Sequence, residues 1–123
     1  DPSRIINIAS TAGLQGYPQV SAYVAAKHGV IGLTRALALE LAKQHLTVNA
    51  VCPGEVNTPM LQSERSEAVT QELLDRIAST VPMGRLAAPD EIARVVAFLA
   101  SDEAAWMTGE TIPVDGGHLV ASL

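Results

Sequence analysis

Residues 4–27 read RIINIASTAGLQGYPQVSAYVAAK, and this stretch decides the fold that we expect. Its first six residues form a largely apolar run that is typical of a buried parallel strand, so Ser10 should lie at the carboxyl end of that strand. Ligands of open α/β sheets bind beyond this end. Tyr23 and Lys27 are four residues apart, a spacing that places both side chains on one face of a helix.

These three side chains suit proton transfer coupled to hydride transfer at a carbonyl or alcohol carbon. A free tyrosine ionises at about pH 10, and a nearby ammonium group favours the phenolate. We therefore expect Lys27 to stabilise the phenolate form of Tyr23, so that Tyr23 can act as a general acid or base, while the Ser10 hydroxyl binds and orients the reacting oxygen. This chemistry requires no metal, and the three histidines of the chain have no metal-ligand spacing.

At these residues the chain resembles the short-chain dehydrogenase/reductase family. That family has a serine after a strand and a tyrosine thirteen positions later, which begins a Y-x-x-x-K motif; Ser10, Tyr23 and Lys27 have these spacings. A Y-x-x-x-K pair alone is weak, but the serine spacing and two later motifs make the combination specific. The resemblance implies an oxidoreductase that uses NAD or NADP and acts on 3-oxoacyl thioesters, sugars, polyols, steroids or small ketones. It also implies that Tyr23 and Lys27 contact the cofactor, with Lys27 at the nicotinamide ribose.

The second motif follows a predicted strand at residues 46–52. Residues 53–60, PGEVNTPM, resemble the family stretch P-G-x-I/V-x-T, which lies beside the nicotinamide. The resemblance assigns cofactor contacts to Pro53, Gly54, Val56 and Thr58. Gln15, in a loop that borders the substrate in the family, and Glu55 are candidate substrate contacts. The alternative interpretation is a common Pro-Gly turn that leaves a strand, with Glu55 as a solvated loop carboxylate.

The third motif, TGETIPVDGG at residues 108–117, resembles the family's T-G-x-x-x-x-V-D-G-G. In the family it carries the last strand and a turn, so we expect Asp115 to be a turn residue and not a catalytic group. Residues 61–88 correspond to the substrate lid of the family, and an amphipathic helix is predicted at 64–79.

A long helix is predicted over residues 21–44, with an apolar stripe on one face and small side chains on another. The stripe consists of Val30, Leu33, Leu37 and Leu41. In the family this helix packs across a subunit interface, which implies a homodimer or a homotetramer. A further helix is predicted from Pro89, with a buried stripe of Ile92, Val95, Val96 and Leu99. We predict Trp106 in the core or an interface and His118 on the surface.

The predicted fold is one α/β unit spanning residues 1–123, with parallel strands at about 4–9, 46–52 and 110–114 and helices between them. By the resemblance, it is the C-terminal part of a doubly wound, Rossmann-type sheet. The glycine-rich phosphate turn and the tetrad asparagine of the family have no counterpart in this sequence. The strand at 4–9 would then expose an apolar edge, so we expect a missing N-terminal half or pairing with another copy.

The net charge of −5 and the pI near 5.0 argue against nucleic acid or an anionic membrane as a partner. No apolar run approaches the roughly 18 residues of a membrane span. The single Cys52 cannot form an internal disulfide and is expected to be a small buried strand residue, so we predict a soluble cytoplasmic protein. The alternative function is an inactive fragment that serves as an oligomerising or interaction module, which the missing phosphate turn favours.

Overall fold

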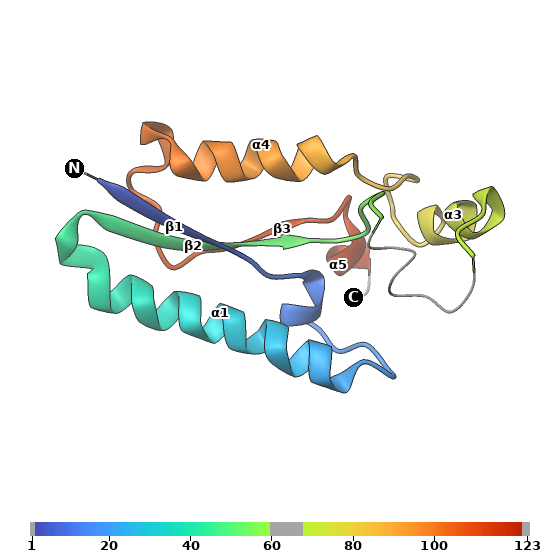
Figure 1. The fold of residues 1–123 in the computed structure, drawn as a ribbon, viewed down its shortest axis with the longest axis horizontal. Helices are drawn as coiled ribbons and strands as arrows, with labels where there is room; N and C mark the ends of the chain where they lie inside the picture. The colour runs from blue at the N-terminus through green and yellow to red at the C-terminus, as the bar shows by residue number, and fades with distance from the viewer. Residues whose placement is uncertain (1, 60–67, 122–123) are drawn as a thin grey trace.

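The computed structural model describes residues 2–59 and 68–121. Their strands form one parallel sheet in the order β1-β2-β3. The strands are β1 (Ser3–Ile8), β2 (Leu46–Pro53) and β3 (Thr111–Val114). Helix α1 (Ser21–Leu41) covers one face of the sheet and α4 (Pro89–Ala100) covers the other (Figure 1). This arrangement confirms the predicted α/β fold with a three-stranded parallel sheet.

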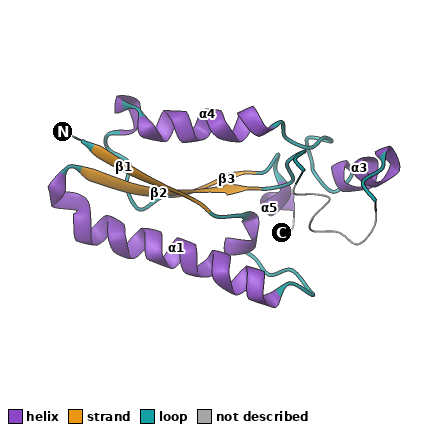
Figure 2. Ribbon diagram, viewed as in Figure 1, coloured by secondary structure: helices purple, strands orange, loops and turns teal. Residues whose placement is uncertain are grey.

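The register of the sheet brings the carboxyl ends of β1 and β2 together. Ile8 pairs with Val51 at the end of the β1–β2 ladder, and Pro53 pairs with Val114 at the end of the β2–β3 ladder. The first strand spans 3–8 where 4–9 is predicted, although the Ala9 amide still donates to the Val51 carbonyl at 2.8 Å. Figure 2 shows that loops leave the sheet at this end, where ligands of such sheets bind.

Helix α1 ends three residues before its predicted end. Residues Ala42–Gln44 form a tighter 3-10 turn, η2, and His45 follows with a positive φ of 56°. A left-handed residue at this place ends a helix and redirects the chain, so the chain can enter β2 at the next residue.

The face of α1 that meets the sheet differs from the predicted leucine stripe. The buried residues of α1 are Ile31, Thr34 and Ala38, whereas Leu33 is 53% exposed. The Thr34 hydroxyl donates to the Val30 carbonyl at 2.8 Å and accepts a hydrogen bond from the Asn7 side chain at 3.0 Å. A polar pair therefore ties α1 to β1, and the predicted stripe faces partly outward.

On the opposite face, α4 packs as predicted. Its apolar stripe surrounds a buried cluster of Val51, Leu99 and Ala104, the last of which lies in the 3-10 turn η3 (Asp102–Ala104). The stripe residues in contact with this cluster include Ile92, Val95 and Val96. Of the two predicted positions for Trp106, the core is wrong, because the side chain is fully exposed, and the interface stays a prediction.

The lid region 61–88 is described only from residue 68 onward, so residues 64–67 of the helix predicted at 64–79 lie outside the described part. Helix α3 spans Gln71–Ala78, and its first turn is capped by the Thr70 hydroxyl, which accepts from the Leu73 amide at 3.1 Å. Residues 68–70 are not helical. Leu73 and Ile77 are buried together, as the amphipathic pattern predicts. A short helix near the end of the chain, α5 (His118–Ala121), had no sequence signal.

Across residues 2–59 and 68–121, no helix combines the length and apolar character needed to cross a membrane. Within the same residues, no three His, Cys, Asp or Glu side chains are grouped so that they could hold a metal ion.

Candidate active site

Ser10 lies two residues beyond the end of β1 and caps the start of a 3-10 turn, η1 (Thr11–Gly13). Its Oγ accepts a hydrogen bond from the Ala12 amide at 3.1 Å. A serine hydroxyl has one hydrogen to donate besides its acceptor positions. The turn therefore fixes the Ser10 oxygen and leaves its hydrogen available for a second oxygen atom.

Tyr23 and Lys27 occupy successive turns at the start of α1, and the structure brings their side chains together. The Lys27 Nζ lies 5.6 Å from the centroid of the Tyr23 ring. The same Nζ donates to the backbone carbonyl of Ile8, at the end of β1, at 3.3 Å. Tyr23 is 42% exposed, so its ring is open to a ligand. Lys27 thus joins the tyrosine to the strand end that carries Ser10.

The turn after β2 packs tightly against the end of β3. The Gly54 amide donates to the Val114 carbonyl at 3.0 Å. A Cβ on Gly54 would lie 2.9 Å from Asp115 Cβ, closer than a side chain could come without displacing its neighbour. Pro53 is the last residue of β2. The predicted cofactor stretch therefore begins from a rigid corner of the sheet.

Beyond this corner, Val56 forms an isolated parallel bridge with Ala87. Ala87 donates to the Glu55 carbonyl and accepts from the Asn57 amide, both at 3.0 Å. In a parallel bridge of this kind, the amide and carbonyl of the central residue face away from the partner. The backbone groups of Val56 are therefore presented to the opposite side, which fits the predicted contact with a ligand. Thr58 follows on the same stretch and is half-buried.

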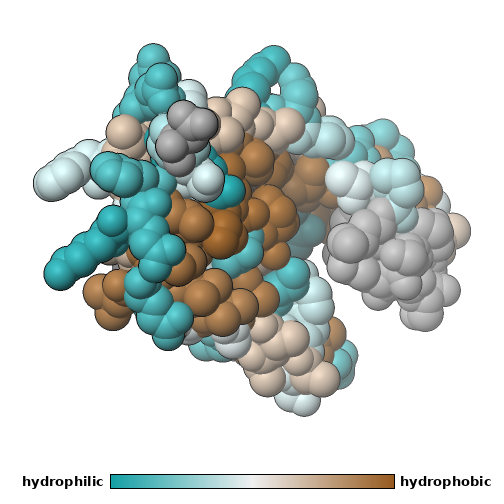
Figure 3. All heavy atoms as spheres, turned by 60° about the vertical axis from the view of Figure 1, so that its left-hand side comes forward, coloured by the Kyte–Doolittle hydropathy of each residue, from teal (hydrophilic) through white to brown (hydrophobic). Residues whose placement is uncertain are grey.

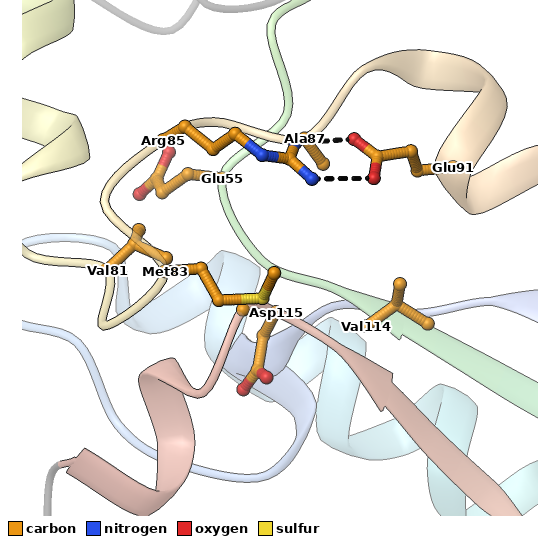
Figure 4. A pocket seen from close by; sticks show the side chains of 9 residues that line it. Glu55, Val81, Met83, Arg85, Ala87, Glu91, Val114 and Asp115 are labelled. Atoms are coloured by element: carbon orange, nitrogen blue, oxygen red, sulfur yellow. Dashed lines mark hydrogen bonds and ion pairs between the residues drawn. The ribbon is translucent and has the colours of Figure 1, made fainter.

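The two predicted substrate residues lie in different places. Gln15 is half-buried just after η1, where its backbone amide donates to the Thr11 carbonyl at 3.1 Å. Glu55 instead lines a small cavity of about 110 Å³ beside Met83 and Arg85 (Figure 4). The structure thus places Gln15 beside the Ser10 turn, and Glu55 in a separate cavity.

Arg85 in this cavity is paired with Glu91 at the start of α4. The Nη1 and Nη2 atoms of Arg85 donate to the two carboxylate oxygens at 2.6 and 2.9 Å. This pairing, together with a hydrogen bond from the Ala88 amide, lowers the pKa of Glu91 to about 2. The positive charge of Arg85 is therefore already neutralised by Glu91. The main effect of this ion pair is to join the lid region to α4.

Two other residues that could take part in chemistry, Asp115 and Cys52, have structural roles instead. Asp115 accepts hydrogen bonds from the amides of Gly117 and Leu119 at 3.1 and 2.9 Å, as expected for a turn residue. Cys52 is fully buried in a cluster with Ala9 and Ile31, and burial raises the pKa of its thiol. These observations confirm both structural interpretations.

The family model described as enoyl-(acyl carrier protein) reductase matches residues 1–118 of this chain. The chain belongs to the short-chain dehydrogenase/reductase family. Acetoacetyl-CoA reductase of Shinella zoogloeoides is 49% identical over 116 residues, which cover 94% of this chain and 46% of that protein. The 3-oxoacyl-(acyl-carrier-protein) reductase of Pseudomonas aeruginosa is 51% identical over 114 residues, 93% of this chain and 44% of that protein.

Among solved structures, an actinorhodin polyketide ketoreductase with NADPH has a TM-score of 0.86 and 48% identity. The match covers 95% of this chain and 47% of that one. This short-chain dehydrogenase/reductase chain thus spans about half the length of the relatives named here.

The family motifs gave no signal for a second group of side chains around the Ser10 turn. The Thr11 hydroxyl and the Tyr17 hydroxyl share a hydrogen bond of 2.8 Å. The Tyr17 ring in turn stacks on His118, with centroids 6.3 Å apart. The prediction of a surface His118 is wrong, because its side chain is half-buried and stacks on Tyr17. Residues that meet only through the fold leave no periodicity, so no sequence pattern could have found them.

Proposed function

We propose that the complete protein is an oxidoreductase that uses NAD or NADP and moves a hydride between the nicotinamide and a carbonyl or alcohol carbon of a small molecule. The observation that carries this proposal is the position of Lys27, whose ammonium lies over Tyr23 and bonds to the end of the strand that leads to Ser10. The NADPH in a structure 48% identical to this chain supports the choice of cofactor.

In the direction of reduction, the bound cofactor supplies the hydride. Tyr23 donates its phenolic proton to the reacting oxygen. Ser10 donates a hydrogen bond to the same oxygen and orients it, because its Oγ is already fixed by the Ala12 amide. The Lys27 ammonium offsets the negative charge that the proton transfer leaves on the tyrosine.

The residues after β2 fit a nicotinamide. We assign the carboxamide contacts to the backbone amide and carbonyl of Val56, which face away from Ala87, and to the Thr58 hydroxyl. Pro53 and Gly54 complete this nicotinamide site, because the close packing of Gly54 on Asp115 keeps the turn after β2 in place. Tyr23 and Lys27 would contact the ribose.

For the substrate we propose a 3-oxoacyl thioester. The printed names of two relatives, acetoacetyl-CoA reductase and 3-oxoacyl-(acyl-carrier-protein) reductase, support this class. Gln15 is a candidate contact because it follows the Ser10 turn, and Glu55 because it opens onto the cavity of Figure 4. Residues 61–88 would close over the substrate as a lid.

We further propose that residues 1–123 form the C-terminal part of a doubly wound sheet and that the phosphate-binding half lies on a preceding segment. β1 is an edge strand, and its Ile8 is 49% exposed.

Figure 3 shows apolar side chains gathered over the middle of one face of the molecule. Leu33 and Leu39 on α1 are 53% and 84% exposed, which supports a homodimer or homotetramer.

The test is a titration of the purified full-length protein with NADPH and NADH, followed by a turnover assay with acetoacetyl-CoA. The proposal expects one nucleotide to bind and to be oxidised only when the thioester is present. Binding without turnover would reject the substrate class and retain the cofactor. If neither nucleotide binds, the protein is not this oxidoreductase, and the exposed face of α1 then favours an oligomerising module.

A further inference from the structure

The turn that follows Ser10 touches α1 directly, and Gly13 is the point of contact. A Cβ built on Gly13 would lie 2.6 Å from Ile31 Cδ1 and 2.9 Å from the backbone oxygen of Lys27. Ordinary contacts of a Cβ begin at 3.4 Å. Because glycine has no side chain, the turn rests against the backbone of the lysine whose ammonium lies over Tyr23.

The two close contacts of Gly13 differ in kind. Ile31 Cδ1 is the end of a flexible side chain and can rotate away at small cost. The Lys27 oxygen belongs to the helix backbone, so it moves only if α1 moves. A larger residue at position 13 would therefore separate the turn from α1 by about 0.5 Å, the difference between 2.9 Å and an ordinary contact.

The turn itself is also fixed on its other sides. Residues Thr11–Gly13 are all buried. The Gly13 amide donates to the Ser10 carbonyl at 2.9 Å, and Thr11 is held by the Tyr17 hydroxyl at 2.8 Å. A displacement at Gly13 is therefore passed on to Ser10, because the turn has no free space in which to absorb it.

We propose that Gly13 is a positioning residue: its missing side chain sets the separation between the Ser10 hydroxyl and the Tyr23–Lys27 pair. This inference rests on the proposed oxidoreductase function. Gly13 is itself buried and acts only through the contact between the Ser10 turn and Lys27. A misplacement of about 1 Å can cost roughly 100-fold in rate, so a shift of about half that size should cost about tenfold.

The experiment compares four forms of the full-length protein: wild type, Gly13→Ala, Ile31→Val and the double variant. Ile31→Val removes Cδ1, so it relieves the shortest side-chain contact and leaves the contact with the Lys27 oxygen, together with a weaker one of 3.3 Å to Ile31 Cγ1. We expect Gly13→Ala to lower kcat about tenfold with less than a threefold change in the NADPH dissociation constant, because the displacement is passed to Ser10, which has no assigned cofactor contact. The double variant should remain similarly slow, while Ile31→Val should retain most of the activity.

Thermal unfolding of all four forms separates a positioning role from a purely structural one. If Gly13→Ala lowers the midpoint of unfolding but keeps the wild-type kcat below that midpoint, the inference is wrong. Full recovery of kcat in the double variant would also overturn it, because the Lys27 contact would then have no effect. A wild-type protein that oxidises neither nucleotide would instead reject the proposed function, and this inference with it.

Discussion

Asn49 in β2 offers the sharpest test of what holds the last strand in place. Its side chain is 1% exposed. Nδ2 donates to the Met107 carbonyl at 3.0 Å, and Oδ1 accepts from the Glu110 amide at 3.1 Å. Asn49→Leu keeps the number of side-chain heavy atoms and the branch at Cγ but can make neither hydrogen bond. The substitution therefore leaves two backbone groups without their partner at the point where the chain enters β3.

The expected loss of stability follows from these two hydrogen bonds. A buried polar group that loses its partner costs about 1–3 kcal/mol, so two groups would cost roughly 2–6 kcal/mol. Glu110 is an exposed residue, and water can replace part of its lost bond. The leucine side chain also gains from its own burial. We therefore expect Asn49→Leu to lower the free energy of unfolding by about 2–4 kcal/mol.

Equilibrium unfolding of the full-length protein in urea measures this difference. The protein concentration must be the same for all variants, because association of subunits adds to the apparent stability. Gln44→Leu, the same exchange of a polar for an apolar side chain at an exposed position, is the matched control and should change stability by less than about 0.5 kcal/mol. A loss below about 1 kcal/mol for Asn49→Leu would show that these two hydrogen bonds do not hold the last strand in place.

Three further predictions concern the core, the lid and the site. Leu99→Ala should lower the free energy of unfolding by about 2–5 kcal/mol in the same urea assay, because Leu99 is fully buried. Glu91 should titrate at about pH 2 in a carboxyl-detected NMR experiment, and Arg85→Met should return its pKa toward about 4.3. Because the folded pKa is lowered, the stabilisation is complete above the unfolded value and is lost as the pH falls through about 2; titration near pH 4 in the wild type would contradict this. Lys27→Met should lower kcat/KM about 10–100-fold in the NADPH assay, the equivalent of one hydrogen bond to a charged group; an unchanged value would remove Lys27 from its role.

The elements that the sequence predicted well are those with a strong apolar pattern, either continuous or periodic. β2 is a nearly continuous apolar run, and the structure buries it on both faces. The stripe of α4 repeats at helical spacing and packs against Val51 as predicted. The apolar residues of α1 lie nearly all round the helix, so periodicity could not show that Thr34 faces the sheet while Leu33 faces outward.

For the candidate site, the spacing of Tyr23 and Lys27 was sufficient to predict that their side chains lie together, because one helix holds both residues. Contacts that depend on the path of the chain between elements were not predictable. Tyr17 meets His118 only because the loop after η1 and the start of α5 lie at the same edge of the sheet. Gly13 is visible in the sequence, but its contact with the Lys27 backbone depends on how closely the turn and α1 approach each other.

The central claim, that Tyr23 transfers the proton, is tested most directly by the kcat of Tyr23→Phe in the full-length protein with saturating nucleotide and thioester. We expect a loss of about 100–10,000-fold, the usual contribution of a general acid or base, with nucleotide affinity nearly unchanged. Tyr17→Phe removes the only other phenol hydroxyl of the chain and should lose less than about tenfold, since that hydroxyl bonds to Thr11. If Tyr23→Phe keeps the wild-type kcat, Tyr23 is not the proton donor.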